Sequence, residues 1–211
     1  MHSRRRVQLW GCTRLRLEDC KRCKRLAAGL RKLRKVHPDW HNAPVGAVGP
    51  ADAPLLIVGL APGKTGANRT GVPFVGDKSS SWLGARLAWA GLLDDNGQPE
   101  GVRITNAVKC LPPKNTPTAA EIRTCTTHFL AKELQHPSLR SVLCLGGVAH
   151  RAVNATLGIP QRSHPFAHGA HYQLDQLSLF SAFHPSPLNT QTGRLSPQQF
   201  EAVLAATLTS L

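Results

Sequence analysis

Short apolar runs rich in β-branched residues are separated by longer segments in which apolar residues recur at helical spacing. The runs predict four strands, at residues 55–58, 102–108, 141–145 and 177–183. Helices are expected between them and after the last one. Strands that alternate with helices favour a doubly wound α/β fold with right-handed crossovers. We therefore expect a three-layer αβα sandwich around a central four-stranded, mostly parallel sheet.

Three helix starts carry capping signals. Thr118 with Glu121, and Ser196 with Gln199, have the spacing of a capping box. A serine cluster, residues 79–81, is expected to cap a helix that runs to about residue 93.

The N-terminal segment from residue 15 to residue 36 also has a helical pattern, with three leucines on one face. Cys20 and Cys23 stand at its start. Their i, i+3 spacing in a helix would point both sulfurs to one side.

Charge is concentrated at the N-terminus. Of the formal net charge of +14, residues 1–35 carry +11, from thirteen Lys and Arg against Glu18 and Asp19. Such a segment favours nucleic acid as a partner. The 211 residues suit one domain, which we place at residues 20–211 behind a basic arm at residues 1–19.

Two classes of protein are disfavoured by the apolar pattern. No run approaches the roughly 20 apolar residues that cross a membrane. The basic start, Met1 to Arg6, is not followed by the apolar stretch of a secretory signal. We expect a cytoplasmic protein.

The six cysteines, without an export signal, favour metal ligation or redox chemistry over disulfides. Cys20 and Cys23 form a C-x-x-C pair, and Cys110 and Cys125 follow with fourteen residues between them. Cys144 lies in an apolar run and is expected to be an inert buried thiol. Three histidines gather at His164, His168 and His171. No acid or cysteine accompanies them in that segment, so we prefer polar surface roles to zinc ligation.

Polar side chains follow the predicted strands. The carboxyl ends of parallel strands meet at one edge of the sheet, where α/β proteins bind their ligands. The loop from Gly59, together with Asn106, Gly146 and His184, falls at such ends. These groups can therefore share one crevice although they are far apart in sequence.

The loop that begins at Gly59 has two interpretations. Gly63-Lys64-Thr65 looks like the end of a phosphate-binding loop, but the spacing of the glycines fails by one residue and Pro62 removes an amide donor. A flat heterocycle suits the crevice better than a triphosphate does. Phe74 can stack on it, Asn106 can pair with its edge, His184 can donate a hydrogen bond, and Asp77 supplies an acid.

The motifs along this crevice resemble those of the uracil-DNA glycosylase superfamily, in particular its iron-sulfur-containing family 5 (type b). The resemblance covers the chain from about Cys20 to the C-terminus. The matching stretches are residues 59–63, 66–71, 73–77, 108–110, 112–115, 184–186 and 189–195. Leu60 stands where the neighbouring family 4 has an acid, and this separates the two families.

The resemblance implies an enzyme that flips uracil, and other deaminated bases, out of DNA and hydrolyses the N-glycosidic bond without lyase activity. It implies that Asp77 and His184 are catalytic. Asp77 would orient water or stabilise the positive sugar, and His184 would meet the charge growing on the base. The residues implied to bind the base are Gly59, Ala61, Phe74 and Asn106.

The same resemblance implies the remaining parts of the site. The residues implied to contact DNA are Lys114, Asn115, Leu188, Asn189 and Arg194, with Leu188 and Arg194 as candidates for a wedge. Cys20, Cys23, Cys110 and Cys125 would hold a structural 4Fe-4S cluster, although four cysteines alone equally allow zinc. We expect a nucleoid-associated monomer.

A second hypothesis is a non-enzymatic nucleic-acid-binding iron-sulfur or zinc protein. It would keep the basic segment and the cysteines but would not need Asp77 or His184.

Overall fold

The computed structural model describes residues 16–211, so most of the arm predicted for residues 1–19 lies outside the described residues. Five strands form one sheet in the order β2-β1-β3-β5-β4. The strands are β1 (Leu55–Gly59), β2 (Val102–Asn106), β3 (Ser141–Leu145), β4 (His171–Leu174) and β5 (Leu177–Ala182).

The predicted parallel core of the sheet is confirmed, and one strand is added to it. The neighbouring strands β2, β1, β3 and β5 are all parallel. The sequence pattern did not predict β4, which pairs antiparallel with β5 at the edge. Its residues alternate between exposed and half-buried, whereas the other four strands are buried at nearly every position.

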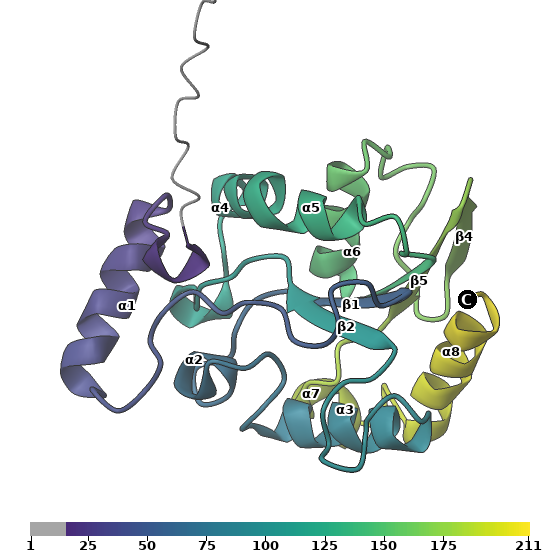
Figure 1. The fold of residues 1–211 in the computed structure, drawn as a ribbon, viewed down its shortest axis with the longest axis horizontal. Coiled ribbons are helices and arrows are strands. Elements are labelled where there is room, and N and C mark those ends of the chain that lie inside the picture. The colour runs from purple at the N-terminus through teal and green to yellow at the C-terminus, as the bar shows by residue number, and fades with distance from the viewer. Residues whose placement is uncertain (1–15) are drawn as a thin grey trace, which may run out of the picture.

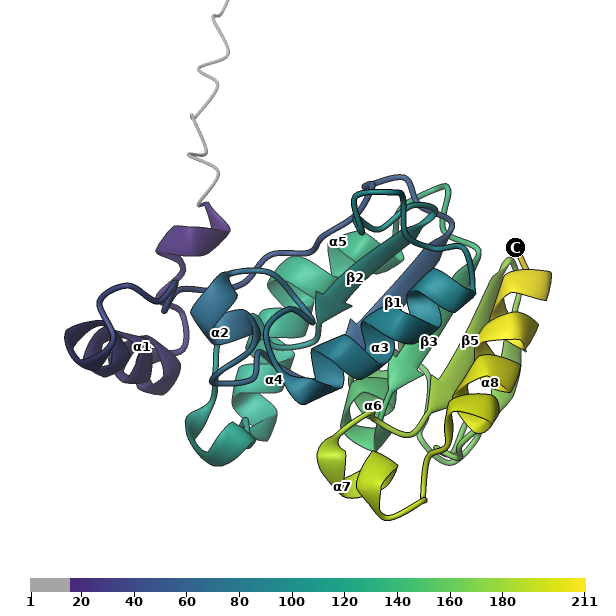
Figure 2. The same ribbon diagram turned by 90° about the horizontal axis from the view of Figure 1, so that it is seen from below.

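Helices cover both faces of the sheet (Figures 1 and 2). The four longer helices are α1 (Lys24–Val36), α3 (Lys78–Trp89), α6 (Gly147–Thr156) and α8 (Pro197–Thr209). The shorter ones are α2 (Ala67–Thr70), α4 (Ala119–Cys125), α5 (Ala131–Leu134) and α7 (Pro187–Gln191). A π-helical segment, Thr126–Leu130, joins α4 to α5, and 3-10 turns occupy Leu17–Asp19 and Pro113–Asn115.

Two hydrophobic cores explain why β1 is apolar at every position. Leu55 and Ile57 face the core that α3 and α8 close, where Phe200 is fully buried. Leu56 and Val58 face the other core, which α5 and α6 close. A strand with both faces covered has no solvent side, so alternation disappears.

A third, smaller core holds α1 against the end of the sheet. Leu26 and Leu30 of α1 pack with Val108, Cys110 and Cys125. Figure 2 shows α1 at the end of the molecule where α2 and α4 lie. The N-terminal helix is thus joined to the body through the cysteine residues.

Two details of the predicted helices are wrong. Cys20 and Cys23 are not inside a helix, because both have extended backbone and α1 begins only at Lys24. Helix α3 is capped by Asp77 rather than by a serine of residues 79–81, and it ends at Trp89. Both capping boxes, at Thr118 and Ser196, are confirmed. Among residues 16–211, no helix has the length and apolar character needed to cross a bilayer.

Candidate active site

A cavity of about 350 Å³ lies at the carboxyl edge of the sheet. Its walls come from the segments that follow β1, β2, β3 and β5, as expected for a ligand site in an open α/β sheet. Of the side chains expected at the site, those that line the cavity are Ala61, Phe74, Asp77, Asn106, Asn115 and His184. The fold therefore brings together residues that lie up to 123 positions apart.

The carboxylate of Asp77 is held at the start of α3. Its Oδ1 accepts hydrogen bonds from the Ser80 backbone N–H at 2.9 Å and from the Ser80 hydroxyl at 2.7 Å. The Oδ2 atom lies over the glycines of the preceding loop: a Cβ on Gly63 would come within 2.8 Å of it, and one on Gly66 would clash with it. One oxygen is thus fixed by the cap, while the described residues provide no hydrogen bond to the other.

Phe74 and Asn106 pack over the end of β1. A side chain at Gly59 would lie 2.7 Å from the Phe74 ring and would clash with the Asn106 Oδ1 atom. Gly59 therefore lies behind the cavity lining and leaves room for the two residues in front of it. Phe74 has a φ of 53°, in the left-handed region that side chains other than glycine rarely adopt. Such strain is often kept where a side chain must face a ligand.

His184 faces Asp77 and Phe74 across the cavity. Burial lowers the pKa of its imidazole, and the nearby Asp77 carboxylate opposes part of that shift. The ring centroids of His184 and Phe74 are 6.2 Å apart. A lowered pKa keeps the ring neutral near pH 7, so that one ring nitrogen can donate a hydrogen bond without carrying a charge.

The residues expected to contact DNA occupy two loops beside the cavity. Asn115 lines the cavity itself, and Lys114 next to it is exposed. Leu188 on α7 is 73% exposed, directly after two residues that line the cavity. The Asn189 side chain donates to the His184 carbonyl at 2.8 Å, and the Arg194 guanidinium lies 4.4 Å from the centre of the Phe183 ring. Leu188 is thus the apolar side chain that projects from this loop.

The four cysteines expected as ligands surround a second, small cavity under α1. Its walls are otherwise mostly apolar, with Leu26, Val108 and Phe129 among them. The Lys109 backbone N–H donates to the Cys125 sulfur at 3.2 Å. Burial and the neighbouring cysteines raise the pKa of Cys110 to about 12, and burial raises that of Cys125 to about 11.

These features fit a cationic metal group bound by thiolates. Buried thiols resist ionisation until a positive charge lies beside them, and an N–H···S bond stabilises a thiolate ligand. Within residues 16–211, no three His, Cys, Asp or Glu side chains are arranged to hold a metal ion. The four cysteines are a donor set that either zinc or an iron-sulfur cluster takes.

Two buried groups were not anticipated from the sequence. Ser80 was considered only as a cap, whereas its role is to fix Asp77. Lys109 is 2% exposed, its ammonium group contacts the Thr105 hydroxyl, and burial lowers its pKa to about 8. Lys109 lines the cysteine cavity and not the cavity that contains Asp77. No local sequence signal distinguishes it from the many exposed lysines.

The three clustered histidines pack against aromatic rings of β4, of β5 and of the segment after β5. His171 stacks on Phe180 with ring centroids 4.1 Å apart, and His168 stacks on Phe183 at 5.0 Å. The Phe183 backbone N–H donates to the His168 ring nitrogen at 3.1 Å. His164 lies with its ring against Tyr172.

The structure is thus an α/β protein with a cavity lined by polar and aromatic side chains at the carboxyl edge of its sheet. Residues 46–207 match the family model of the uracil DNA glycosylase superfamily. A type-5 uracil-DNA glycosylase of Thermus thermophilus is 40% identical over 205 residues, which cover 89% of this chain and 92% of that protein. The type-5 enzyme of Pyrobaculum aerophilum is 39% identical, with 90% and 88% covered, whereas a type-4 enzyme of Archaeoglobus fulgidus matches only 50% of this chain at 37% identity.

The chain therefore belongs to the uracil DNA glycosylase superfamily, and within it to the type-5 family. The family expected from the sequence motifs is confirmed.

The lowered pKa of His184 can be tested directly. We expect its imidazole to titrate below the usual value of about 6.5, because burial disfavours the charged ring. Asp77→Asn removes the carboxylate that favours the charged ring, so the pKa should fall further. A histidine NMR titration measures both values, with His184→Gln to assign the signal. A pKa above the usual value, or a rise in Asp77→Asn, would contradict the assigned electrostatics.

Proposed function

We propose that this protein is a monofunctional DNA repair glycosylase that removes uracil, and other deaminated bases, from DNA and leaves an abasic site. The observation that carries the proposal is the convergence of Phe74, Asp77, Asn106 and His184 on one cavity, in a chain of the uracil DNA glycosylase superfamily. Its volume of about 350 Å³ suits a small ligand held by a few polar groups.

The base would be recognised by three groups. Phe74 offers a ring face for stacking, and its backbone strain is consistent with a side chain held toward a ligand. Within residues 16–211, the Asn106 amide makes no hydrogen bond to the protein, although the residue is only 4% exposed. An amide can donate to one atom and accept from another on a base edge. Neutral His184 would donate to a carbonyl oxygen of the base.

Hydrolysis breaks the bond between the base nitrogen and the sugar C1′ carbon. The bonding electrons leave with the base, so the base becomes negative and the sugar becomes an oxocarbenium-like cation. The His184 hydrogen bond strengthens as charge grows on the base oxygen, and the Asp77 carboxylate opposes the positive sugar. Water would then add to C1′, and the proton it loses would pass to solvent or to the base anion. The Oδ2 atom of Asp77, which accepts no hydrogen bond from the described residues, would accept a hydrogen bond from that water and orient it.

Excision without lyase activity is supported by the positions of the lysines. A lyase needs an amine that attacks C1′ and forms a Schiff base. Among residues 16–211, no lysine lines the cavity, and Lys109, whose pKa burial lowers, lies beside the cysteines instead.

A uracil-containing oligonucleotide, with matched hypoxanthine and xanthine strands, tests the activity. We expect alkali-labile abasic sites with wild-type protein, and a rate reduced by on the order of a thousandfold in Asp77→Asn. Asparagine caps helices as well as aspartate does, so this variant should keep its fold and its DNA affinity. Gel analysis of single-turnover reactions measures the rates.

Absence of product from every deaminated base would remove the enzymatic proposal. The protein would then be a nucleic-acid-binding metal protein. Full activity in Asp77→Asn would leave the activity but refute the role of Asp77.

We further propose that Leu188 fills the space left by the flipped base. Flipping a base out of duplex DNA costs the free energy of its stacking and pairing, and flipping a base of single-stranded DNA costs much less. Leu188→Ala should therefore slow excision from duplex DNA by on the order of tenfold and leave single-stranded DNA nearly unaffected. Trp89→Ala is a matched control, because Trp89 is also exposed, at 56%, but stands at the far end of α3 from the cavity. Equal losses on both substrates would exclude a wedge.

The four cysteines at the second cavity are proposed to hold a structural 4Fe-4S cluster, which ties α1 to the segments after β2 and in α4. The purified protein should contain about four irons per chain and show broad visible absorbance. Cys110→Ala should lose both, whereas Cys144→Ala should keep them, because Cys144 is buried inside β3 away from this cavity. A colourless protein with one zinc per chain would identify a zinc site instead.

A further inference from the structure

The loop between β2 and α4 is strained at the point where it reaches the cavity. Lys114 and Asn115 are consecutive residues with φ values of 54°, in the left-handed region. Neither is a glycine, so both conformations cost free energy that neighbouring contacts must offset. Asn115 is the residue of this loop that lines the cavity.

The hydrogen bonds within the loop join only residues of the loop to one another. The Asn115 N–H donates to the Pro112 carbonyl at 3.0 Å, and the Thr116 N–H donates to the Pro113 carbonyl at 3.1 Å. The Thr116 hydroxyl donates to the Lys114 carbonyl at 3.1 Å. These bonds shape the turn but do not attach it to the rest of the protein.

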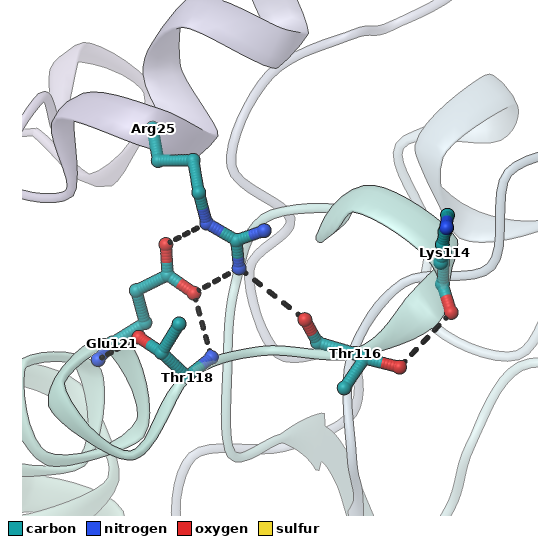
Figure 3. Close-up of polar contacts among 5 residues, drawn as sticks. All are labelled: Arg25, Lys114, Thr116, Thr118 and Glu121. Carbon is teal, nitrogen blue, oxygen red and sulfur yellow. Dashed lines mark hydrogen bonds and ion pairs between the residues drawn. The ribbon is translucent and has the colours of Figure 1, made fainter.

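Arg25 of α1 provides that attachment (Figure 3). Its Nη2 donates to the Thr116 carbonyl at 3.2 Å and to Glu121 Oε2 at 2.6 Å, while its Nε donates to Glu121 Oε1 at 2.8 Å. Glu121 Oε2 also accepts from the Thr118 N–H at 2.8 Å, in the capping box that starts α4. One guanidinium therefore contacts both the loop and the helix that follows it.

The geometry of this contact requires arginine. A guanidinium presents several donors in a planar fork, so it can bind both oxygens of a carboxylate and a carbonyl together. The Glu121 side chain is only 9% exposed, while that of Arg25 is 43% exposed. The pair is therefore half-buried, and removing Arg25 would leave the Glu121 carboxylate without its cationic partner. Because the same guanidinium also donates to the Thr116 carbonyl, the contact sets the position of the loop as well.

We propose that Arg25 is a positioning residue for base excision: through Thr116 and Glu121 it holds the loop in the strained conformation that places Asn115 at the cavity. Arg25 lies two residues after Cys23, and Glu121 lies four before Cys125. The pair thus connects the segment that carries the cysteines with the segment that reaches the base. This inference rests on the proposed glycosylase activity.

The test compares Arg25→Gln with Lys24→Gln on a duplex uracil substrate under single-turnover conditions with saturating protein. Both variants remove one positive charge from the same helix, but Lys24 makes no hydrogen bond or ion pair among the described residues. We expect Arg25→Gln to lower the excision rate by on the order of tenfold. Lys24→Gln should stay within about twofold of wild type, and Arg25→Lys should recover only part of the loss. The iron content of Arg25→Gln should remain that of wild type, and its melting temperature should fall but stay well above the assay temperature, so that the protein is fully folded when the rate is measured.

A double-mutant cycle with Asn115→Ala shows whether Arg25 acts through Asn115. If it does, Arg25→Gln should cause no further loss in the Asn115→Ala background. Additive losses would overturn the inference, as would equal rates for Arg25→Gln and Lys24→Gln. A loss of iron or of melting temperature that accounts for the lower rate would also overturn it. Inactive wild-type protein would instead refute the proposed function, so the two failures are distinguishable.

Discussion

The hydrogen bonds from Ser80 to the Asp77 carboxylate determine the geometry of the cavity. Asp77 serves two purposes at once: it satisfies free N–H groups at the start of α3, and it presents its second oxygen above a loop of glycines. A capping side chain is fixed by the helix backbone, so its carboxylate has little rotational freedom. In the proposed reaction, an acid held in place before the substrate arrives would stabilise the short-lived positive sugar without first having to reorient.

The second organising feature is the path of the chain after β2. It passes Cys110, forms the strained loop that carries Asn115, and enters α4, where Cys125 lies. A metal group bound to both cysteines would join the two ends of the segment 110–125 and reduce the conformational freedom of the loop between them. Arg25 of α1 adds a further contact to the middle of this segment, at Thr116 and Glu121. If the proposals hold, Arg25 and the loop connect the cysteine segments to the cavity, and the metal group would have a structural role.

Much of the fold could be predicted from local patterns. The four parallel strands are rich in apolar residues and largely buried because helices cover both faces of the sheet, and both capping boxes consist of residues three positions apart. Two features could not be predicted in this way: the residue that caps α3, because several neighbouring residues are suitable caps, and the strand at the edge of the sheet. Asp77 and three serines are all good caps, and only the packed helix shows which one is used. The edge strand β4 has one exposed face and histidine at its start, so its pattern indicates no strand.

The sequence by itself determined the order of the four parallel strands and of the helices between them, the grouping of Asn106 and His184 at strand ends with Asp77 in the segment after the first strand, and membership in the family. These follow from short-range patterns and from the spacing of motifs within one chain. The tertiary structure alone decided which groups face the cavity and how they are held. Gly59 lies behind Phe74 and Asn106, Lys109 is buried beside the cysteines, and Arg25 reaches Glu121, 96 residues away. Such contacts depend on how separate elements pack, and no local pattern encodes the distance between two side chains that are far apart in sequence.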